Sequence, residues 1–188
     1  MEDCKAAIRW LRAHAKEYGL DGQRVGVWGA SAGGHLAALV GTAGDKKEWD
    51  AKGPHPEISS RVQAVVDWFG PTDLVPMVRA ANPGKKDNPV ALLLGGPGEH
   101  LVEKARQASP VTYVSSDDPP FLIQHGDADR LVPLAQSRAL ADKLRGAGVE
   151  VTLVTIPGAG HGDAPFRAEG KTIAQVAEFF ERHLKKRN

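Results

Sequence analysis

The sequence predicts an α/β domain: a three-layer α/β/α sandwich around a mostly parallel sheet of about four strands. Short β-branched and apolar runs alternate with longer amphipathic stretches along the whole chain, which is the order of a parallel sheet with crossover helices. The short runs are apolar at consecutive positions, as strands covered on both faces are. At 188 residues, the chain has the length of one domain with a sizeable core.

The composition fits a globular protein and argues against several classes of partner. The formal net charge is +1 and the lysines and arginines are scattered, so no basic stripe points to nucleic acid or to an anionic membrane. No apolar run approaches the ~20 residues of a membrane span, and the charged N-terminal stretch differs from a signal peptide. The one cysteine, Cys4, cannot form an intrachain disulfide. These features predict a cytoplasmic protein without nucleic-acid or membrane partners.

Each strand is predicted from an apolar run bounded by turn residues. The predicted strands are Arg24–Trp28, Val62–Phe69, Pro120–His125 and Val149–Ile156. Helices are predicted where apolar residues recur at helical spacing, as Ile8, Leu11 and Tyr18 do near the N-terminus. The longer predicted helices span residues 2–18, 32–42, 134–146 and 171–184.

A long segment between the second and third strands is predicted as an insertion. Residues 72–118 are broken by prolines and hold three shorter helical stretches, which are Leu74–Ala81, Val90–Leu94 and Glu99–Gln107. An excursion of this length between strands is uncommon in a compact domain and is often functional. We therefore expect a single domain over residues 1–188 with a cap-like insertion around 72–118.

A candidate nucleophile lies between the first strand and the helix after it. Ser31 stands in Gly29-x-Ser31-x-Gly33, the pattern of a nucleophile elbow, in which a strand-to-helix turn lifts a serine hydroxyl out of the sheet. Glycine at both ends of the pattern is expected to remove Cβ atoms that would collide in so tight a turn. The helix that starts at Ala32 directs its first N–H groups toward an oxyanion beside Ser31.

A base and an acid follow Ser31 in the chain. His161 lies in a glycine-rich loop after the fourth strand, and Asp127 and Asp129 follow the third strand. The carboxyl ends of parallel strands meet at one sheet edge, so these side chains are expected to converge there. Serine needs a base to take its proton, and the base needs a carboxylate to orient it. Spacing leaves both Asp127 and Asp129 open as that carboxylate.

Six segments carry a resemblance to a known family. They are Arg24-Val-Gly-Val-Trp-Gly-Ala-Ser-Ala-Gly-Gly-His-Leu-Ala37, Asp67-Trp-Phe-Gly-Pro-Thr-Asp73, Ala108-Ser-Pro-Val-Thr-Tyr113, Asp118-Pro-Pro-Phe-Leu-Ile123, His125-Gly-x-x-Asp129-x-x-Val-Pro133 and Gly158-Ala-Gly-His161-Gly. In combination they resemble an α/β-hydrolase esterase of the carboxylesterase/lipase and feruloyl- or acetyl-xylan-esterase-like kind. The resemblance implies an ester hydrolase, and it makes Asp129, the aspartate of His-Gly-x-x-Asp, the acid.

The chain also departs from this esterase pattern. Such esterases carry an N-terminal block with a His-Gly-Gly-Gly oxyanion loop, and this sequence contains no His-Gly-Gly. By resemblance, Arg24–Trp28 is the fifth of eight strands, so a truncated α/β-hydrolase fold is expected. The N–H of Ala32 is then one oxyanion donor and the second is missing. Losing one donor typically costs about 10²–10³ in kcat.

The exposed edge expected at the first strand predicts that a second chain pairs with it. Without neighbours before it, Arg24–Trp28 becomes an exposed apolar edge, and such an edge invites pairing with another chain. We expect a homodimer in which a second copy covers that edge or the surface around it.

The sequence therefore predicts a serine esterase that cleaves carboxylic esters, above all short-chain acyl esters. Ser31 is the expected nucleophile, His161 the general base and acid, and Asp129 the orienting carboxylate, while Trp68 and Phe69 are candidates for the acyl pocket. No metal or organic cofactor is expected. Two alternatives stay open: a serine peptidase of the prolyl-oligopeptidase-like kind, and a weak or silent hydrolase that acts as a binding or scaffold protein.

Overall fold

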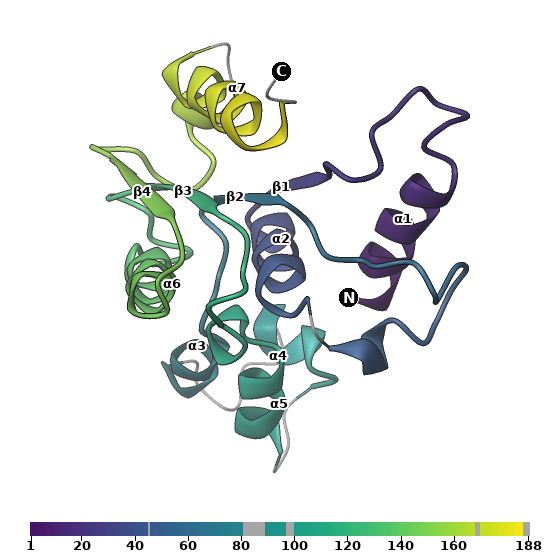
Figure 1. The fold of residues 1–188 in the computed structure, drawn as a ribbon. Coiled ribbons are helices and arrows are strands. Elements are labelled where there is room, and N and C mark those ends of the chain that lie inside the picture. The colour runs from purple at the N-terminus through teal and green to yellow at the C-terminus, as the bar shows by residue number, and fades with distance from the viewer. Residues whose placement is uncertain (45, 81–88, 97–99, 168–169, 186–188) are drawn as a thin grey trace.

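The protein is built around one parallel sheet of four strands (Figure 1). The computed structural model describes residues 1–44, 46–80, 89–96, 100–167 and 170–185. The strands lie in the order β1-β2-β3-β4, and all three neighbouring pairs are parallel. Their bounds are β1 (Gly26–Ala30), β2 (Ala64–Trp68), β3 (Phe121–Gly126) and β4 (Val151–Ile156). The predicted parallel sheet of about four strands is confirmed.

β1 extends further toward the candidate nucleophile than the predicted strand did. Gly29 pairs with Asp67, and Ala30 pairs with Trp68, so part of the Gly-x-Ser-x-Gly pattern belongs to the sheet. The prediction ended earlier because glycine is depleted in strands. As a result, Ser31 follows directly on the last paired residue of β1.

Helices cover both faces of the sheet and give the predicted three layers (Figure 1). On one face, α2 (Ala32–Thr42) and α6 (Ala135–Gly146) form a core with Val65. On the other face, α7 (Lys171–Leu184) packs against Val66. Consecutive residues of β2 thus enter opposite cores, which explains why residues 64–66 are all apolar. Within the described part of the chain, no helix combines the length and the apolar character needed to cross a membrane.

The first helix is shorter than predicted. α1 spans Glu2–Ala13, whereas apolar spacing predicted a helix over residues 2–18. Tyr18 is 54% exposed, and its ring lies beside that of Trp10 with 5.6 Å between the centroids. The chain after Ala13 forms turns, so the spacing of Tyr18 matched a helix that the backbone does not make.

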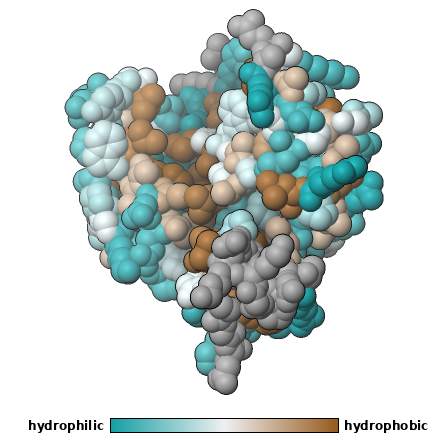
Figure 2. Space-filling model, turned by 180° about the vertical axis from the view of Figure 1, so that it is seen from behind, coloured by the Kyte–Doolittle hydropathy of each residue, from teal (hydrophilic) through white to brown (hydrophobic). Residues whose placement is uncertain are grey.

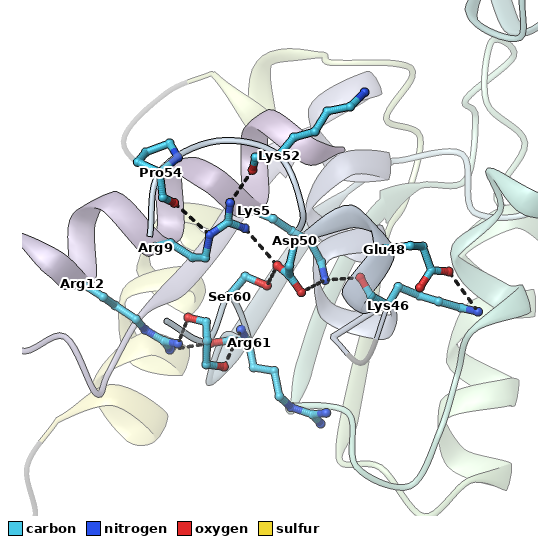
Figure 3. Close-up of polar contacts among 11 residues, drawn as sticks. Lys5, Arg9, Arg12, Lys46, Glu48, Asp50, Lys52, Pro54, Ser60 and Arg61 are labelled. Carbon is cyan, nitrogen blue, oxygen red and sulfur yellow. Dashed lines mark hydrogen bonds and ion pairs between the residues drawn. The ribbon is translucent and has the colours of Figure 1, made fainter. Parts of the chain in front are cut away.

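Buried ion pairs hold α1 to the loop that follows α2 (Figure 3). Lys5 Nζ and Arg9 Nη1 each lie 3.0 Å from a carboxylate oxygen of Asp50, and both cationic side chains are fully buried. Ser60 Oγ donates a further hydrogen bond to Asp50 (2.6 Å). Burial acts to raise the pKa of Asp50, but the hydrogen bonds from Ser60 and Lys5 and the two positive charges outweigh it and hold that pKa below its ordinary value. Asp50 therefore stays ionised between the two cations.

Between β2 and β3 the chain leaves the sheet for three short helices. Their bounds are α3 (Leu74–Ala80), α4 (Pro89–Leu93) and α5 (Leu101–Gln107). They share a small core, which includes Leu74, Val78, Val90 and Ala105. Residues 81 and 99, predicted at the ends of two of these helices, lie outside the described residues.

β1 forms one edge of the sheet, and among the described residues only β2 pairs with it. Trp28 of β1 is 44% exposed. Figure 2 shows apolar side chains gathered in a hollow between α1 and the rest of the molecule. Leu11 of α1 and Leu36 of α2 are also among the exposed large apolar residues. This side of the sheet is therefore left partly uncovered.

Candidate active site

Ser31 stands at a strained turn between β1 and α2. Its φ of 55° and ψ of −120° lie where residues with a Cβ are rarely found, as a nucleophile elbow requires. The Ser31 N–H donates to the carbonyl of Trp68 on the neighbouring strand (2.8 Å), and the Ser31 carbonyl accepts from the N–H of His35 (3.0 Å). Bonds to the sheet and to the helix thus hold the turn in place.

Of the two glycines in the elbow pattern, only Gly29 lies where a Cβ atom would collide with its neighbours. A Cβ on Gly29 would lie 2.1 Å from the carbonyl oxygen of Gly33, whereas a Cβ on Gly33 would meet no described atom within 4 Å. Gly34 is also required, because a Cβ there would lie 2.4 Å from Oδ1 of Asp67. The expectation that both glycines of the pattern avoid collisions is therefore corrected: Gly33 supplies the backbone to which Gly29 must stay close.

The structure joins Ser31, His161 and Asp129 in one chain of hydrogen bonds. His161 Nε2 lies 2.8 Å from Ser31 Oγ, and His161 Nδ1 lies 2.7 Å from Asp129 Oδ2. An ionised carboxylate only accepts, so Nδ1 carries the ring proton and Nε2 is left to accept from the serine hydroxyl. The three side chains follow β1, β4 and β3, and they meet at the carboxyl edge of the sheet.

Asp129 is a buried carboxylate with donors on both oxygens. Its Oδ1 accepts from the N–H groups of Leu131 (2.8 Å) and Val132 (2.9 Å), while Oδ2 faces His161. Burial acts to raise the pKa of Asp129, but the hydrogen bonds from Val132, His161 and Leu131 outweigh burial and hold the pKa below its ordinary value. The group facing His161 is therefore an oriented anion.

An apolar cavity of about 480 Å³ opens beside Ser31. Its wall includes Leu74 and Met77 of α3, Val90 and Leu93 of α4, and Leu131 of the loop after β3, together with Ser31, Ala32, His35, Pro71, Pro89 and Val132. None of the described lining residues is a carboxylate, a lysine or an arginine. The described part of its wall is therefore mostly apolar.

Trp68 and Phe69, the predicted candidates for an acyl pocket, are placed elsewhere. Both are 4% exposed and belong to the core on the α7 face, and neither lines the cavity at Ser31. The indole N–H of Trp68 donates to Oε1 of Gln124. Phe69 packs edge-on against His161, with 4.8 Å between ring centroids. Phe69 thus contacts the candidate base, while α3 and α4 supply most of the apolar wall.

Ala32 begins α2 and lines the cavity next to Ser31. The first N–H groups of a helix have no acceptor within the helix, and the helix dipole is positive at this end. The Ala32 N–H is therefore suited to negative charge beside Ser31. Among the described residues, no three His, Cys, Asp or Glu side chains are grouped so that they could hold a metal ion.

One buried residue of the site, His125, was not predicted to take part. Its Nε2 lies 3.2 Å from Oδ2 of Asp129, and its side chain is fully buried. Its position in the His-Gly-x-x-Asp segment, four residues before Asp129, is the signal that marks it. His35, by contrast, donates from Nε2 to the carbonyl of Ala108 (2.7 Å), and burial lowers its pKa, in line with a packed helix residue.

Comparisons with known proteins point to esterases. The chain is 36% identical to a truncated form of a carbohydrate esterase from gut microbiota, with a TM-score of 0.87 over 98% of this chain and 68% of that one. An esterase of Thermogutta terrifontis with bound propionate is 30% identical, with a TM-score of 0.74, covering 100% of this chain and 66% of that one. LipM of Mycobacterium tuberculosis, a probable carboxylic ester hydrolase, is 35% identical over 76% of this chain.

The chain spans only 33% of the length of LipM. The two solved structures share its fold at 36% and 30% identity, so the expected α/β-hydrolase esterase fold is confirmed. The BD-FAE family model matches residues 1–144, which is more than half of the chain. This protein belongs to the BD-FAE family.

Proposed function

We propose that this protein hydrolyses carboxylic esters through an acyl-enzyme formed on Ser31. The observation that carries the proposal is the chain of hydrogen bonds from Ser31 Oγ through His161 to Asp129, with links of 2.8 and 2.7 Å. A serine that shares its proton with an oriented histidine is a nucleophile for acyl carbons. The similarity to a probable carboxylic ester hydrolase supports an ester as the substrate.

The reaction has two halves. Ser31 Oγ attacks the carbonyl carbon while its proton passes to Nε2 of His161, and Asp129 stabilises the imidazolium through Nδ1–H. The oxyanion forms beside the N–H of Ala32, and when it collapses the alcohol leaves with the proton from His161. Water then attacks the acyl-enzyme by the same route, which releases the acid and restores Ser31.

The substrate class that we propose is an ester with a short, uncharged acyl group. The wall supplied by Leu74, Met77, Val90 and Leu93 offers no partner for a charged group, which would lose its hydration there. The propionate bound by the Thermogutta esterase supports a short acyl chain. Because α3 and α4 form this wall, we propose that residues 72–118 act as a cap over the site.

We assign the N–H of Ala32, at the start of α2, as an oxyanion donor. Removal of one such donor typically costs about 10²–10³ in kcat.

The test combines labelling with kinetics. The wild type is expected to react with a fluorophosphonate probe and to hydrolyse p-nitrophenyl acetate and butyrate faster than long-chain esters, and Ser31→Ala is expected to do neither. A folded wild type that remains unlabelled would favour the binding or scaffold alternative. Faster cleavage of peptide amides than of matched esters would favour the peptidase.

We also propose that a second copy of the chain covers the edge of β1. Two identical edge strands can pair antiparallel about a two-fold axis, which closes both edges at once. The exposure of Trp28 on that strand supports an apolar contact. Sedimentation at micromolar concentration is expected to give a dimer for the wild type and a monomer for Trp28→Lys. A monodisperse wild-type monomer would rule this dimer out.

A further inference from the structure

Besides His161, a second histidine ring lies next to the carboxylate of Asp129, and it is the buried ring of His125. His125, at the end of β3, lies with Nε2 3.2 Å from Oδ2 of Asp129, the same oxygen that accepts from His161. The same Nε2 lies 2.9 Å from the carbonyl oxygen of Val132, whose N–H donates to the other oxygen of Asp129. The side chains of both His125 and Asp129 are fully buried.

The neighbours of His125 fix which of its ring nitrogens carries the proton. Both groups that face Nε2, a carboxylate and a backbone carbonyl, only accept hydrogen bonds, so Nε2 must donate. Nδ1 lies 2.7 Å from Oγ of Ser137 on α6, and the serine hydroxyl can donate to it. Burial lowers the pKa of His125, which agrees with a neutral ring that donates from Nε2 and accepts at Nδ1.

We propose that His125, oriented by Ser137, is a positioning residue that fixes the carboxylate of Asp129 for His161. This inference rests on the proposed function. The N–H groups of Leu131 and Val132 hold only Oδ1. Nε2 of His125 donates to the carbonyl of Val132 at 2.9 Å and lies 3.2 Å from Oδ2, so its N–H also faces Oδ2 and favours the carboxylate orientation in which Oδ2 is aligned with Nδ1 of His161.

The expected loss of activity without His125 follows from which groups contact each oxygen of Asp129. Losing His125 leaves the two backbone donors in place, so Asp129 stays ionised but rotates more freely. The charged or titratable groups that bear on His125 are Asp129 and His161, and its fully buried side chain does not line the cavity at Ser31. The loss should therefore lower kcat by about 10–100-fold, the range found when a partner that orients a metal-binding side chain is lost, and leave KM nearly unchanged.

Three variants of the full chain test the proposal with p-nitrophenyl butyrate. His125→Leu keeps much of the volume and removes the donor, and kcat is expected to fall by about 10–100-fold. His125→Gln places an amide N–H near the position of Nε2 and is expected to recover most of that loss. Ser137→Ala removes only the donor to Nδ1 and is expected to lower kcat by a smaller factor. Leu144→Ala, a fully buried position of α6 in the core, is the control for lost stability.

A proton spectrum supplies a readout that packing alone does not move. The Nδ1–H of His161 in its bond to Asp129 is expected to give a downfield signal that weakens in His125→Leu and persists in His125→Gln and Leu144→Ala. A folded His125→Leu with wild-type kcat and an intact signal overturns the proposal. If His125→Leu does not fold, an unchanged kcat and signal in Ser137→Ala overturn it instead. A wild type that is inactive and unlabelled refutes the proposed esterase activity. In that case the downfield Nδ1–H signal of His161 in the variants still decides whether His125 positions Asp129.

Discussion

Asp127 and Asp129 lie in one loop, yet they accept hydrogen bonds from different partners in the site. Asp129 Oδ2 accepts from Nδ1 of His161 at 2.7 Å, whereas Asp127 Oδ1 accepts from the backbone N–H of Gly158 at 2.7 Å. One carboxylate therefore orients the candidate base, and the other ties down the loop that carries it. Spacing in the sequence does not separate these two roles.

This difference predicts unequal effects of two matched substitutions. Asp129→Asn is expected to lower kcat by about 10³–10⁴, because an amide neither selects the ring tautomer nor stabilises the imidazolium. Asp127→Asn is expected to stay within about 10-fold of the wild type, because its amide oxygen can still accept from Gly158. Steady-state hydrolysis of p-nitrophenyl butyrate measures both, and similar losses would refute Asp129 as the acid.

The two glycines of the elbow predict a second contrast. Gly29→Ala forces a Cβ to within 2.1 Å of the Gly33 carbonyl oxygen, which belongs to the backbone and cannot turn away. We expect this variant to unfold at a lower temperature and to lose labelling by a fluorophosphonate. Gly33→Ala enters open space in the first turn of α2 and should fold and label like the wild type, because alanine favours helix over glycine by up to about 1 kcal/mol. Equal behaviour of the two variants would contradict this account of the elbow.

The strands and the longer helices could be predicted because their signals are local. The runs at 64–66 and 121–123 are apolar at successive positions, and the two cores on either side of the sheet require that pattern. Tyr18 shows where local signals fail, since it has helical spacing but lies beyond the end of α1. The backbone turns after Ala13 and ends the helix there, and apolar spacing alone does not show where such a turn occurs.

The site could be predicted in part for the same reason. Ser31, His161 and the pair of aspartates follow strand ends, and parallel strands bring such residues to one edge. The cavity wall at Val90 and Leu93 could not be predicted, because which turn of the insertion faces Ser31 depends on how α3, α4 and α5 pack together. A role for His125 could not be predicted, because a histidine at a strand end is usually a packing residue and its 3.2 Å distance to Asp129 is visible only in the structure.

The buried ion pairs of α1 predict a large effect on stability. Asp50→Ala leaves the fully buried Lys5 and Arg9 without their carboxylate, and removing one partner of such a pair typically costs about 3–5 kcal/mol. Glu2→Gln is the matched control, because Glu2 pairs with a Lys52 that is 74% exposed and exposed pairs contribute at most about 1 kcal/mol. Urea denaturation measures both free energies of unfolding. A similar small change in both variants would mean that the buried network does not stabilise the attachment of α1.

Asp67 predicts how stability depends on pH. Its carboxyl group is fully buried next to the start of α2, where Oδ1 accepts from the N–H of Gly70 (2.9 Å) and Oδ2 has no hydrogen-bond partner among the described residues. Burial raises the pKa of Asp67 from 3.8 to about 7. The folded protein therefore keeps the proton of Asp67 over a pH range in which the unfolded chain has already lost it.

The sign of the effect follows from linkage. Below about pH 4 both states are protonated at Asp67 and the group has no influence on the unfolding equilibrium. As pH rises from about 4 to about 7 the unfolded state binds fewer protons, so the free energy of unfolding falls, by at most about 4 kcal/mol, and above pH 7 this contribution is constant. Asp67→Asn keeps the shape of the side chain but cannot titrate. In urea denaturation, the difference between its free energy of unfolding and that of the wild type should therefore increase in favour of the variant between pH 5 and pH 8. Asp142→Asn, at a mostly exposed position, should follow the wild-type curve. If the Asp67→Asn curve also stayed parallel to the wild type, Asp67 would have to be ionised in the folded protein across that range.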